Sequence, residues 1–388
     1  MEEWKEYKIG DICSKVCSGG TPSSKHSEYY DGDIPWLNTK EINFNRIYNT
    51  EKTITEEGLD NSSAKWIAEN SVIVAMYGAT AGKTAITKIP LTTNQACCNL
   101  TINHTLADYR FVYYFLCSKF IELASLANGG AQQNLNAQII KDFEIKLPSL
   151  KEQRRIANVL SSLDDKIEVN GRINDNLEQQ AQALFKSWLS DCHEEVTIGQ
   201  LSQNITDYTK CELPKVILIN SSDVTEGHFE HHNFSENRNL KGHFKKRFQK
   251  GDILYSQVRP RNRHWGYCTF DADAYLASTQ LMVIRNKADV IPSILLYQYI
   301  IDDDVWMDFT NKTETRSGTF PQGNYEELSS IKVRYGADMS YISNKLKSIY
   351  TFIFNNEDES RRLAELRDTL LPRLMSGELK VNEVVNSL

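Results

Sequence analysis

Several features that define common classes of protein are missing from this 388-residue sequence. It has no apolar run long enough to cross a bilayer, and its first residues, MEEWKEYKIGDI, lack the pattern of a secretion signal. Its eight cysteines are scattered without a regular framework, which favours reduced thiols over structural disulfides. We therefore expect a cytoplasmic protein whose stability comes from apolar cores.

The motifs of familiar enzymes are also missing. The nine prolines are never adjacent, which excludes the Asx-Pro-Pro-aromatic loop of amino-methyltransferases, and no spacing argues for a nucleophile. Tyr77–Thr84 (YGATAGKT) resembles a phosphate loop, but three residues separate its glycines instead of four, so a tight turn between strands is favoured. Asp302-Asp303-Asp304 lacks companion ligands and fits a helix cap better than a metal site. We expect no catalytic group, cofactor or metal in this chain.

Basic residues gather in one part of an otherwise acidic sequence. The net charge is −7, so global charge does not indicate a nucleic-acid partner. Residues 238–263, however, contain nine Lys and Arg against the single acid Asp252, with aromatics between them. Within this stretch Arg259-Pro260-Arg261-Asn262-Arg263 could read bases, because Arg can bridge guanine O6 and N7 and Asn can pair with adenine. The alternative is a basic face that is only solvated.

The stretch from Ser149 to Trp188 has the clearest periodicity. Its apolar residues recur every 3.5 residues, which is typical of a helix that wraps around another helix, and Asn170 and Asn174 interrupt the stripe. About 40 residues at ~1.5 Å each give a rod roughly 60 Å long, which cannot bury its seam alone. The seam consists of Ile156, Leu160, Leu163, Ile167, Asn170, Asn174, Leu177, Ala181, Leu184 and Trp188.

The same rhythm returns 186 residues later, including its polar interruption. The matching positions are Ile342, Leu346, Ile349, Ile353, Asn356, Ser360, Leu363, Leu370 and Leu374. Only Arg367, at the position that corresponds to Ala181 in the first helix, breaks the pattern. Two unrelated amphipathic helices would not be expected to share a polar break. We therefore predict that the two helices pair antiparallel as an intramolecular coiled coil.

The segments before each helix repeat as well. Val216–Asn220 echoes Ile34–Asn38, and Gly251–Ser256 echoes Asn70–Ala75. The predicted fold class is α+β, with two mixed α/β globules separated by the two helices and related by pseudo-two-fold symmetry. The predicted domains are 1–148 (first globule), 149–192 (central helix), 193–338 (second globule) and 339–388 (distal helix).

Three stretches together resemble one protein family. The run LPSLKEQRRIANVLSSLDDKIEVNGRINDNLEQQAQALFKSWLSD resembles the central conserved region of the specificity subunits of type I restriction–modification systems. SGGTPSSKHSEYYDGDIPWLNTKEI resembles the start of their first target-recognition domain, and LRDTLLPRLMSGEL their distal conserved region. Gly171 departs from the charged residue usual at that place in the family, and a glycine inside a helix costs roughly 1 kcal/mol.

The resemblance implies a non-catalytic DNA-binding subunit of a complex that methylates adenine. Each target-recognition domain would read one half of a bipartite, asymmetric site in double-stranded DNA, and the helices would set the spacing and dock two modification (methyltransferase) subunits. S-adenosylmethionine and ATP would be bound by partner subunits, which include the restriction (motor–nuclease) subunits. The alternatives are an assembly scaffold without base-specific binding, or a stand-alone ATPase or methyltransferase.

The same resemblance places the DNA-contacting side chains in loops of the globules, not in the helices. Side-chain chemistry within those loops selects ten candidates: Thr39, Lys40, Lys83, Gln132 and Gln133 in the first domain, and Ser221, Arg259, Arg261, Asn262 and Arg263 in the second. For each of them an ordinary role in a turn is the alternative.

Overall fold

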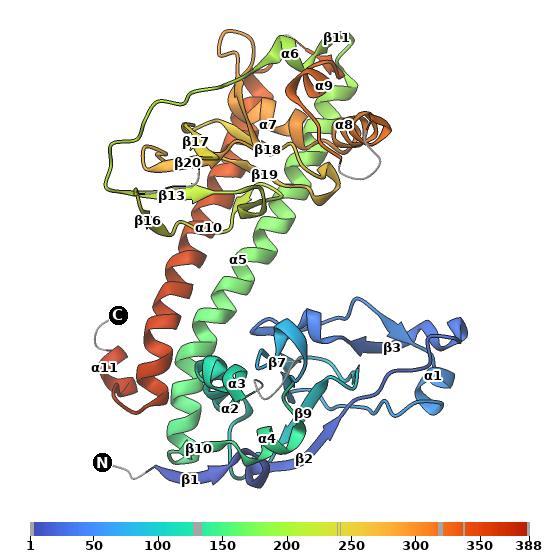
Figure 1. Cartoon of the computed structure of the whole chain (residues 1–388), viewed down its shortest axis with the longest axis vertical. Coiled ribbons are helices and arrows are strands. Elements are labelled where there is room, and N and C mark those ends of the chain that lie inside the picture. The colour runs from blue at the N-terminus through green and yellow to red at the C-terminus, as the bar shows by residue number, and fades with distance from the viewer. Residues whose placement is uncertain are drawn as a thin grey trace. The chain divides into compact units, whose positions relative to one another are not determined.

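The computed structural model describes residues 4–126, 134–238, 240, 242–316, 321–336 and 338–385. The chain divides into two compact units, unit 1 (1–168 with 360–388) and unit 2 (169–359). The two long helices, α5 (Leu150–Ser190) and α10 (Ser340–Met375), each contribute one half to each unit (Figure 1). The predicted fold class, mixed α/β with two long helices, is confirmed, whereas the predicted domain boundaries stay a prediction.

Three sheets and four short helices form the globular part of unit 1, within its described residues. The five-stranded sheet has the order β2 (Cys13–Ser18), β9 (Cys97–Ile102), β6 (Val72–Ala75), β7 (Thr84–Thr87), β4 (Asn45–Ile47). The three-stranded sheet has the order β5 (Thr53–Ile54), β3 (Tyr30–Leu37), β8 (Thr92–Thr93), and β1 (Lys5–Lys8) pairs with β10 (Glu144–Leu147). The helices are α1 (Glu56–Asp60), α2 (Tyr109–Ser118), α3 (Phe120–Leu126) and α4 (Ala137–Asp142), and α11 (Val381–Val385) follows α10.

Unit 2 repeats this plan over the part of it that the structure describes. One sheet has the order β12 (Ser202–Asn204), β21 (Leu281–Asn286), β18 (Ile253–Ser256), β19 (Trp265–Tyr267), and another β16 (Phe234–Glu236), β13 (Lys215–Ile219), β20 (Tyr275–Ser278), β17 (Phe244–Lys246). Two strand pairs complete it, β14 (Val224–Thr225) with β15 (His228–Phe229) and β11 (Glu194–Thr197) with β22 (Lys332–Tyr335). The helices are α6 (Ile198–Leu201), α7 (Ser293–Ile301), α8 (Asp303–Arg316) and α9 (Tyr325–Ser329).

The strand registers show how closely the two units correspond. In unit 1, β3 and β8 pair in parallel with Leu37 opposite Thr93, and in unit 2, β13 and β20 pair in parallel with Ile219 opposite Ala277. The predicted echo between the segments that end at Asn38 and Asn220 is therefore confirmed.

Each unit has two consecutive helices with a break between them, α2 and α3 in unit 1 and α7 and α8 in unit 2. Lys119 leaves helical geometry (φ −101°, ψ 13°) between α2 and α3. Asp302 does so between α7 and α8 (φ −60°, ψ 135°), where its carboxylate accepts a hydrogen bond from the backbone N–H of Asp304 at 3.0 Å. Asp302 thus caps α8, as the sequence predicted for this acidic run.

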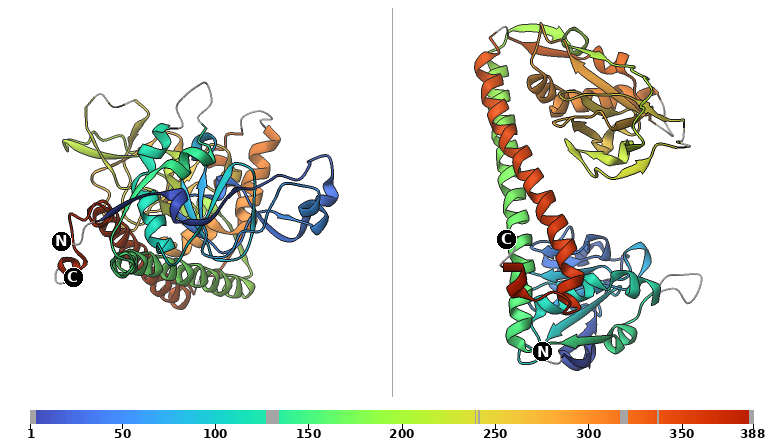
Figure 2. Two further views of the ribbon diagram at one scale, coloured as in Figure 1. Left: turned by 90° about the horizontal axis from the view of Figure 1, so that it is seen from below. Right: turned by 90° about the vertical axis from the view of Figure 1, so that its left-hand side faces the viewer.

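The long helices pair antiparallel and run side by side in both views of Figure 2. Asp164 of α5 contacts Arg367 of α10, while the later Asn174 contacts the earlier Ile353. Apolar residues of both helices share one core in each unit: Ile156, Leu160 and Leu163 with Leu370 and Leu374 in unit 1, and Ala181 and Phe185 with Ile342, Leu346 and Ile353 in unit 2.

The buried face of α5 is wider than the 3.5-residue rhythm predicts. Phe185, outside the predicted seam, meets Tyr299 of α7 with ring centroids 5.0 Å apart. Ala157 is fully buried beside Ile156 in the core that contains Phe111 of α2. In each unit α5 therefore packs on the core of the globule as well as on α10, because the globule supplies apolar residues that a free coiled coil would lack.

The predicted polar interruption forms a hydrogen-bonded layer between the helices in unit 2. The Asn174 side-chain amide donates to the carbonyl of Ile353 at 3.1 Å, and that of Asn356 donates to the Asn174 side-chain oxygen at 2.8 Å. Asn170 donates to a Glu359 carboxylate oxygen at 2.8 Å. α5 continues through Gly171, which is exposed. These bonds fix the register of one helix half against the other.

Candidate nucleic-acid interface

A turn of the same length follows the central strand β6 in unit 1 and β18 in unit 2. In unit 1 the N–H of Ala75 donates to the carbonyl of Lys83 at 2.9 Å, and in unit 2 the N–H of Ser256 donates to that of His264 at 2.8 Å. Adding 181 to the residue numbers of the first bond gives those of the second. The β6–β7 connection is thus the tight strand-to-strand turn predicted for the glycine-rich segment, and it has an exact counterpart of equal length in unit 2.

The backbone of both turns enters the left-handed region at the same two positions. Gly78 and Gly82 have φ of 69° and 86°, and their counterparts Arg259 and Arg263 have φ of 49° and 52°. Glycine adopts this conformation freely, whereas a residue with a Cβ pays roughly 1–2 kcal/mol. Unit 2 therefore carries arginine at two strained positions, and such strain gathers at functional sites.

A second turn follows strand β3 in unit 1 and β13 in unit 2. Both are single 3-10 turns, Thr39–Glu41 and Ser221–Asp223, and both are closed by an acid that accepts from the preceding asparagine N–H. The distances are 2.9 Å from Asn38 to Glu41 and 2.8 Å from Asn220 to Asp223.

The two kinds of turn are joined in each unit. In unit 1 the Lys83 ammonium donates to the Asn43 side chain at 2.7 Å. In unit 2 the N–H of Glu226 donates to the carbonyl of Arg263 at 3.0 Å. A third segment adjoins each first turn, since Tyr77 bridges to Asn134 and Val258 bridges to Gln322. Each unit thereby brings together segments from three separate parts of the chain.

The candidates in unit 1 differ in how far their side chains are available. Lys40 is exposed and pairs with Glu51 at 2.5 Å, whereas Lys83 is half-buried and bonded to Asn43. Thr39 is half-buried in its turn. Gln132 and Gln133 lie outside the described residues.

The candidates in unit 2 differ more strongly in exposure and in their partners. Arg261 is 70% exposed and forms a two-point ion pair with Glu314 of α8, whereas Arg263 is partly buried, bonds to Asp303 at 2.8 Å and stacks 4.1 Å from the Trp306 ring. Asn262 is exposed beside Arg261. The hydroxyl oxygen of Ser221 is buried and has no hydrogen-bond partner within the described chain.

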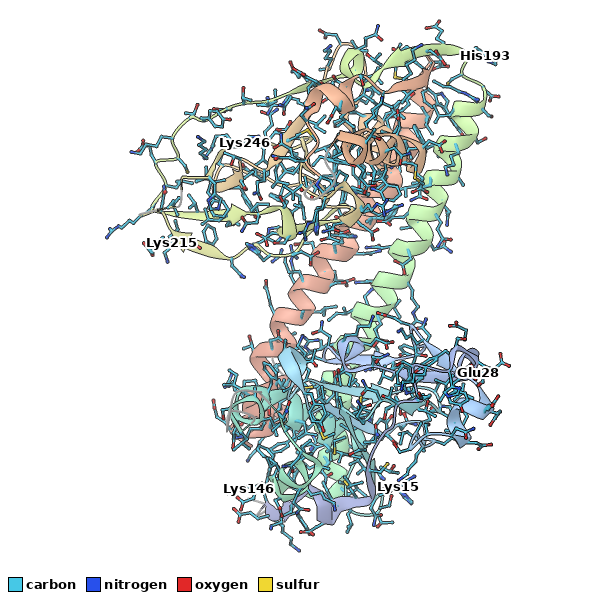
Figure 3. The ribbon with its side chains drawn as sticks, turned by 45° about the vertical axis from the view of Figure 1, so that its right-hand side comes forward. Lys15, Glu28, Lys146, His193, Lys215 and Lys246 are labelled. Atoms are coloured by element: carbon cyan, nitrogen blue, oxygen red, sulfur yellow. The ribbon has the colours of Figure 1, made fainter. Side chains whose placement is uncertain are left out.

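The basic stretch 238–263 does not form one surface. Lys246 is buried and donates to the carbonyl of Leu281 at 2.7 Å, and burial lowers the pKa of its ammonium. Figure 3 shows Lys246 of β17 among the side chains of unit 2, whereas Lys215, on β13 of the same sheet, lies at the outer margin of that unit. Neighbouring Lys245 is exposed over the Tyr208 ring at 4.9 Å. Strand alternation thus divides the basic residues between the interior and the surface.

The buried cysteine thiols are poor nucleophiles. Burial raises the pKa of Cys98 to about 12 and that of Cys268 to about 12, so both stay protonated at neutral pH. Over the described ranges, no three His, Cys, Asp or Glu side chains are grouped to hold a metal ion. Among the described residues, no helix is long and apolar enough to span a membrane.

The chain is built from a duplicated α/β unit in which matching turns present unlike side chains. The Type I restriction modification DNA specificity domain matches residues 1–179. The MjaIX specificity subunit of Methanocaldococcus jannaschii is 26% identical over 99% of this chain and 95% of its own length. The HindI specificity subunit of Haemophilus influenzae is 36% identical over 36% of this chain and 31% of its own.

A solved structure agrees in fold. The S subunit of a type I restriction–modification system from M. genitalium superposes with a TM-score of 0.54 over 96% of both chains, at 18% identity. The chain is thus similar in sequence to specificity subunits of type I restriction–modification systems.

Proposed function

We propose that this protein is the non-catalytic DNA sequence-specificity subunit of a type I restriction–modification complex, and that each unit reads one half of a bipartite, asymmetric site. The observation that carries the proposal is the pair of matching turns. Their backbones agree in length, hydrogen bonding and left-handed positions, yet one turn presents glycine and threonine and the other arginine and asparagine. A shared frame with unlike side chains suits the reading of two different half-sites.

The DNA-contacting residues belong to this proposal as candidates. In unit 2 the exposed Arg261 and Asn262 have the chemistry for base edges, and in unit 1 the exposed Lys40 suits a phosphate. The net charge of −7 supports a division of labour in which partner subunits contribute much of the phosphate contact.

The paired helices supply the proposed dock for two modification subunits, and through their fixed length the spacing of the half-sites. Val169 and Ile173 of α5 are 39% and 44% exposed and line a shallow groove of about 490 Å³. Phe352 of α10 is also exposed. Apolar side chains on a helix surface suit the apolar face of another helix.

The remaining partners follow from the family. S-adenosylmethionine and ATP would be held by the modification and the restriction subunits, and not by this chain. Because the substrate is DNA of the cell or DNA that enters it, the complex would act in the cytoplasm.

The test is selection of duplexes from a random pool by the full chain assembled with its modification subunit, followed by mobility shifts. We expect enrichment of one asymmetric site in two parts separated by a fixed gap. A complex that binds all duplexes equally well would refute the proposal and favour the scaffold. ATP hydrolysis or methyl transfer by this chain alone would favour the enzyme instead.

A further inference from the structure

We infer that Glu314 is the positioning residue for Arg261, and that Arg261 so positioned reads a guanine in the half-site bound by unit 2. This inference rests on the proposed function and adds the base and the residues that select it.

The ion pair orients the guanidinium without using up its donors. Arg261 Nε lies 2.5 Å from Glu314 Oε1, and Nη2 lies 2.6 Å from Oε2, so the carboxylate occupies the side of the planar group. A guanidinium has five N–H donors, and the edge formed by Nη1 and Nη2 remains. Within the described chain Nη1 has no acceptor, and the side chain is 70% exposed. Two N–H groups that point the same way from one edge of the guanidinium can bond to O6 and N7 of guanine together.

The backbone that carries Arg261 is tied to the same helix as Glu314. Trp306 of α8 donates its indole N–H to the carbonyl of Pro260 at 2.9 Å, and Pro260 itself is buried. Arg263, two residues after Arg261, bonds to Asp303 and stacks on Trp306. Both the root and the tip of the Arg261 side chain are therefore held by α8, which reduces the conformational entropy lost when a ligand binds.

Arg263 is by this account an anchor and not a reader. Its guanidinium is engaged by the ring of Trp306 and the carboxylate of Asp303, and its backbone is strained at φ 52°. The contacts with α8 compensate for a conformation that glycine adopts freely at the matching position, Gly82.

The pairing of an exposed arginine with a positioning carboxylate occurs in the turn of unit 2 and not in the matching turn of unit 1. The position that matches Arg261 in the first turn is Thr80, whose hydroxyl donates to the carbonyl of Tyr77 at 3.2 Å. A short hydroxyl side chain turned back on its own loop cannot present a guanidinium fork. Substitution of Arg261 or Glu314 should therefore change the base preference at one half-site and leave that at the other half-site unchanged.

The experiment uses the full chain with its modification subunit and the site selected as above. Each base pair of both half-sites is varied in turn, and the ratio of affinities for the selected and the altered duplex is measured for wild type, R261A, R261K and E314Q. In wild type we expect one guanine in one half-site to be preferred about 10-fold or more. R261A should abolish that preference, and R261K should too, because lysine keeps the charge but not the planar fork.

E314Q separates positioning from mere shielding. If Glu314 orients Arg261, the preference at that one base pair falls several-fold, even if removal of the negative charge strengthens binding to all DNA. If E314Q strengthens binding and leaves the preference unchanged, Glu314 only competes with DNA and the inference is wrong. R373A is the matched control, since Arg373 is an exposed arginine whose Nε pairs with Glu378 at 3.0 Å, and it should change no base preference.

A failure of the proposed function and a failure of the role of Arg261 give different results. A wild-type complex without any sequence preference would overturn the proposed function. A wild-type complex with a clear site, which R261A or R261K reads with unchanged base preferences, would overturn only the role of Arg261.

Discussion

Arg367 of α10 and Asp164 of α5 form an ion pair with 2.8 Å between Nη1 and Oδ1. This is the position where an arginine interrupts the repeated apolar seam. The second Asp164 oxygen accepts a hydrogen bond from the Tyr114 hydroxyl at 2.5 Å. Burial acts most strongly on the pKa of Arg367 and lowers it, but the hydrogen bonds and charges of Asp164 and Asp368 together outweigh burial and hold that pKa above its usual value. The break in the seam is thus a polar contact that joins both helices to the globule of unit 1.

The Asp164 contact yields a first prediction about stability. D164N should lower the free energy of unfolding by about 2 kcal/mol, because Arg367 would keep its charge in a largely buried place without its main partner. Urea denaturation of the full chain measures this. D368N is the control, since Asp368 contacts the same guanidinium but is 63% exposed and should matter little. Equal losses for the two variants would contradict the assignment.

The left-handed backbone at Arg259 predicts an unusual order of stabilities. At φ 49° a glycine is relaxed and an alanine is strained, so R259G should be more stable than R259A by about 1 kcal/mol. At the exposed helical position Arg361 the order should reverse by about the same amount, because glycine is unfavourable inside a helix. Thermal unfolding of the glycine and alanine variants at both positions measures these differences. If the alanine variant were the more stable at both positions, the backbone at Arg259 would not be strained.

The asparagine layer predicts coupling between two residues on different helices. N174L should destabilise the chain, because the Asn356 amide loses the acceptor it bonds at 2.8 Å. N356L in the same chain should recover much of that loss. A double-mutant cycle by chemical denaturation should return a coupling of about 1 kcal/mol. A coupling near zero would mean that this hydrogen bond does not stabilise the helix pair.

A histidine at the helix pair predicts a dependence on pH. The hydrogen bond between His228 Nδ1 and Glu357, 2.9 Å long, raises the pKa of His228 despite its partial burial, and Glu178 and Glu230 add to the effect. A raised pKa means that protonated His228 stabilises the fold, fully below about pH 6.5 and no longer above the raised pKa.

The measurement compares unfolding at pH 6 and pH 9 for wild type and H228Q. The variant should lose stability at pH 6 and lose less at pH 9. E357Q, which removes the partner, should weaken the same pH dependence. A loss for H228Q that is the same at both pH values would show that the ion pair contributes nothing.

The exposed face of α5 predicts the site of subunit docking. I173D should weaken association with the modification subunit without unfolding the chain, because Ile173 is already 44% exposed. Analytical ultracentrifugation of mixtures measures the association. Q179D changes an exposed residue on another face of α5 and should leave it intact. If I173D associated with the modification subunit as strongly as wild type does, the docking site would have to lie elsewhere.

Local pattern and repetition determined much of this protein in advance. The 3.5-residue rhythm and the 186-residue shift predicted two paired helices, because a seam that exposes apolar residues requires a partner. Repeated strand-and-turn segments predicted two similar globules, since strands and tight turns depend mainly on neighbouring residues.

What only the tertiary structure decided concerns partners far apart in the sequence. Nothing local relates Arg261 to Glu314, 53 residues away, or distinguishes the exposed Arg261 from the anchored Arg263. The burial of Lys246 inside a basic stretch is likewise a consequence of where its strand lies. Sequence patterns report which residues prefer water, whereas the availability of a charged side chain depends on which other charge or ring the fold places beside it.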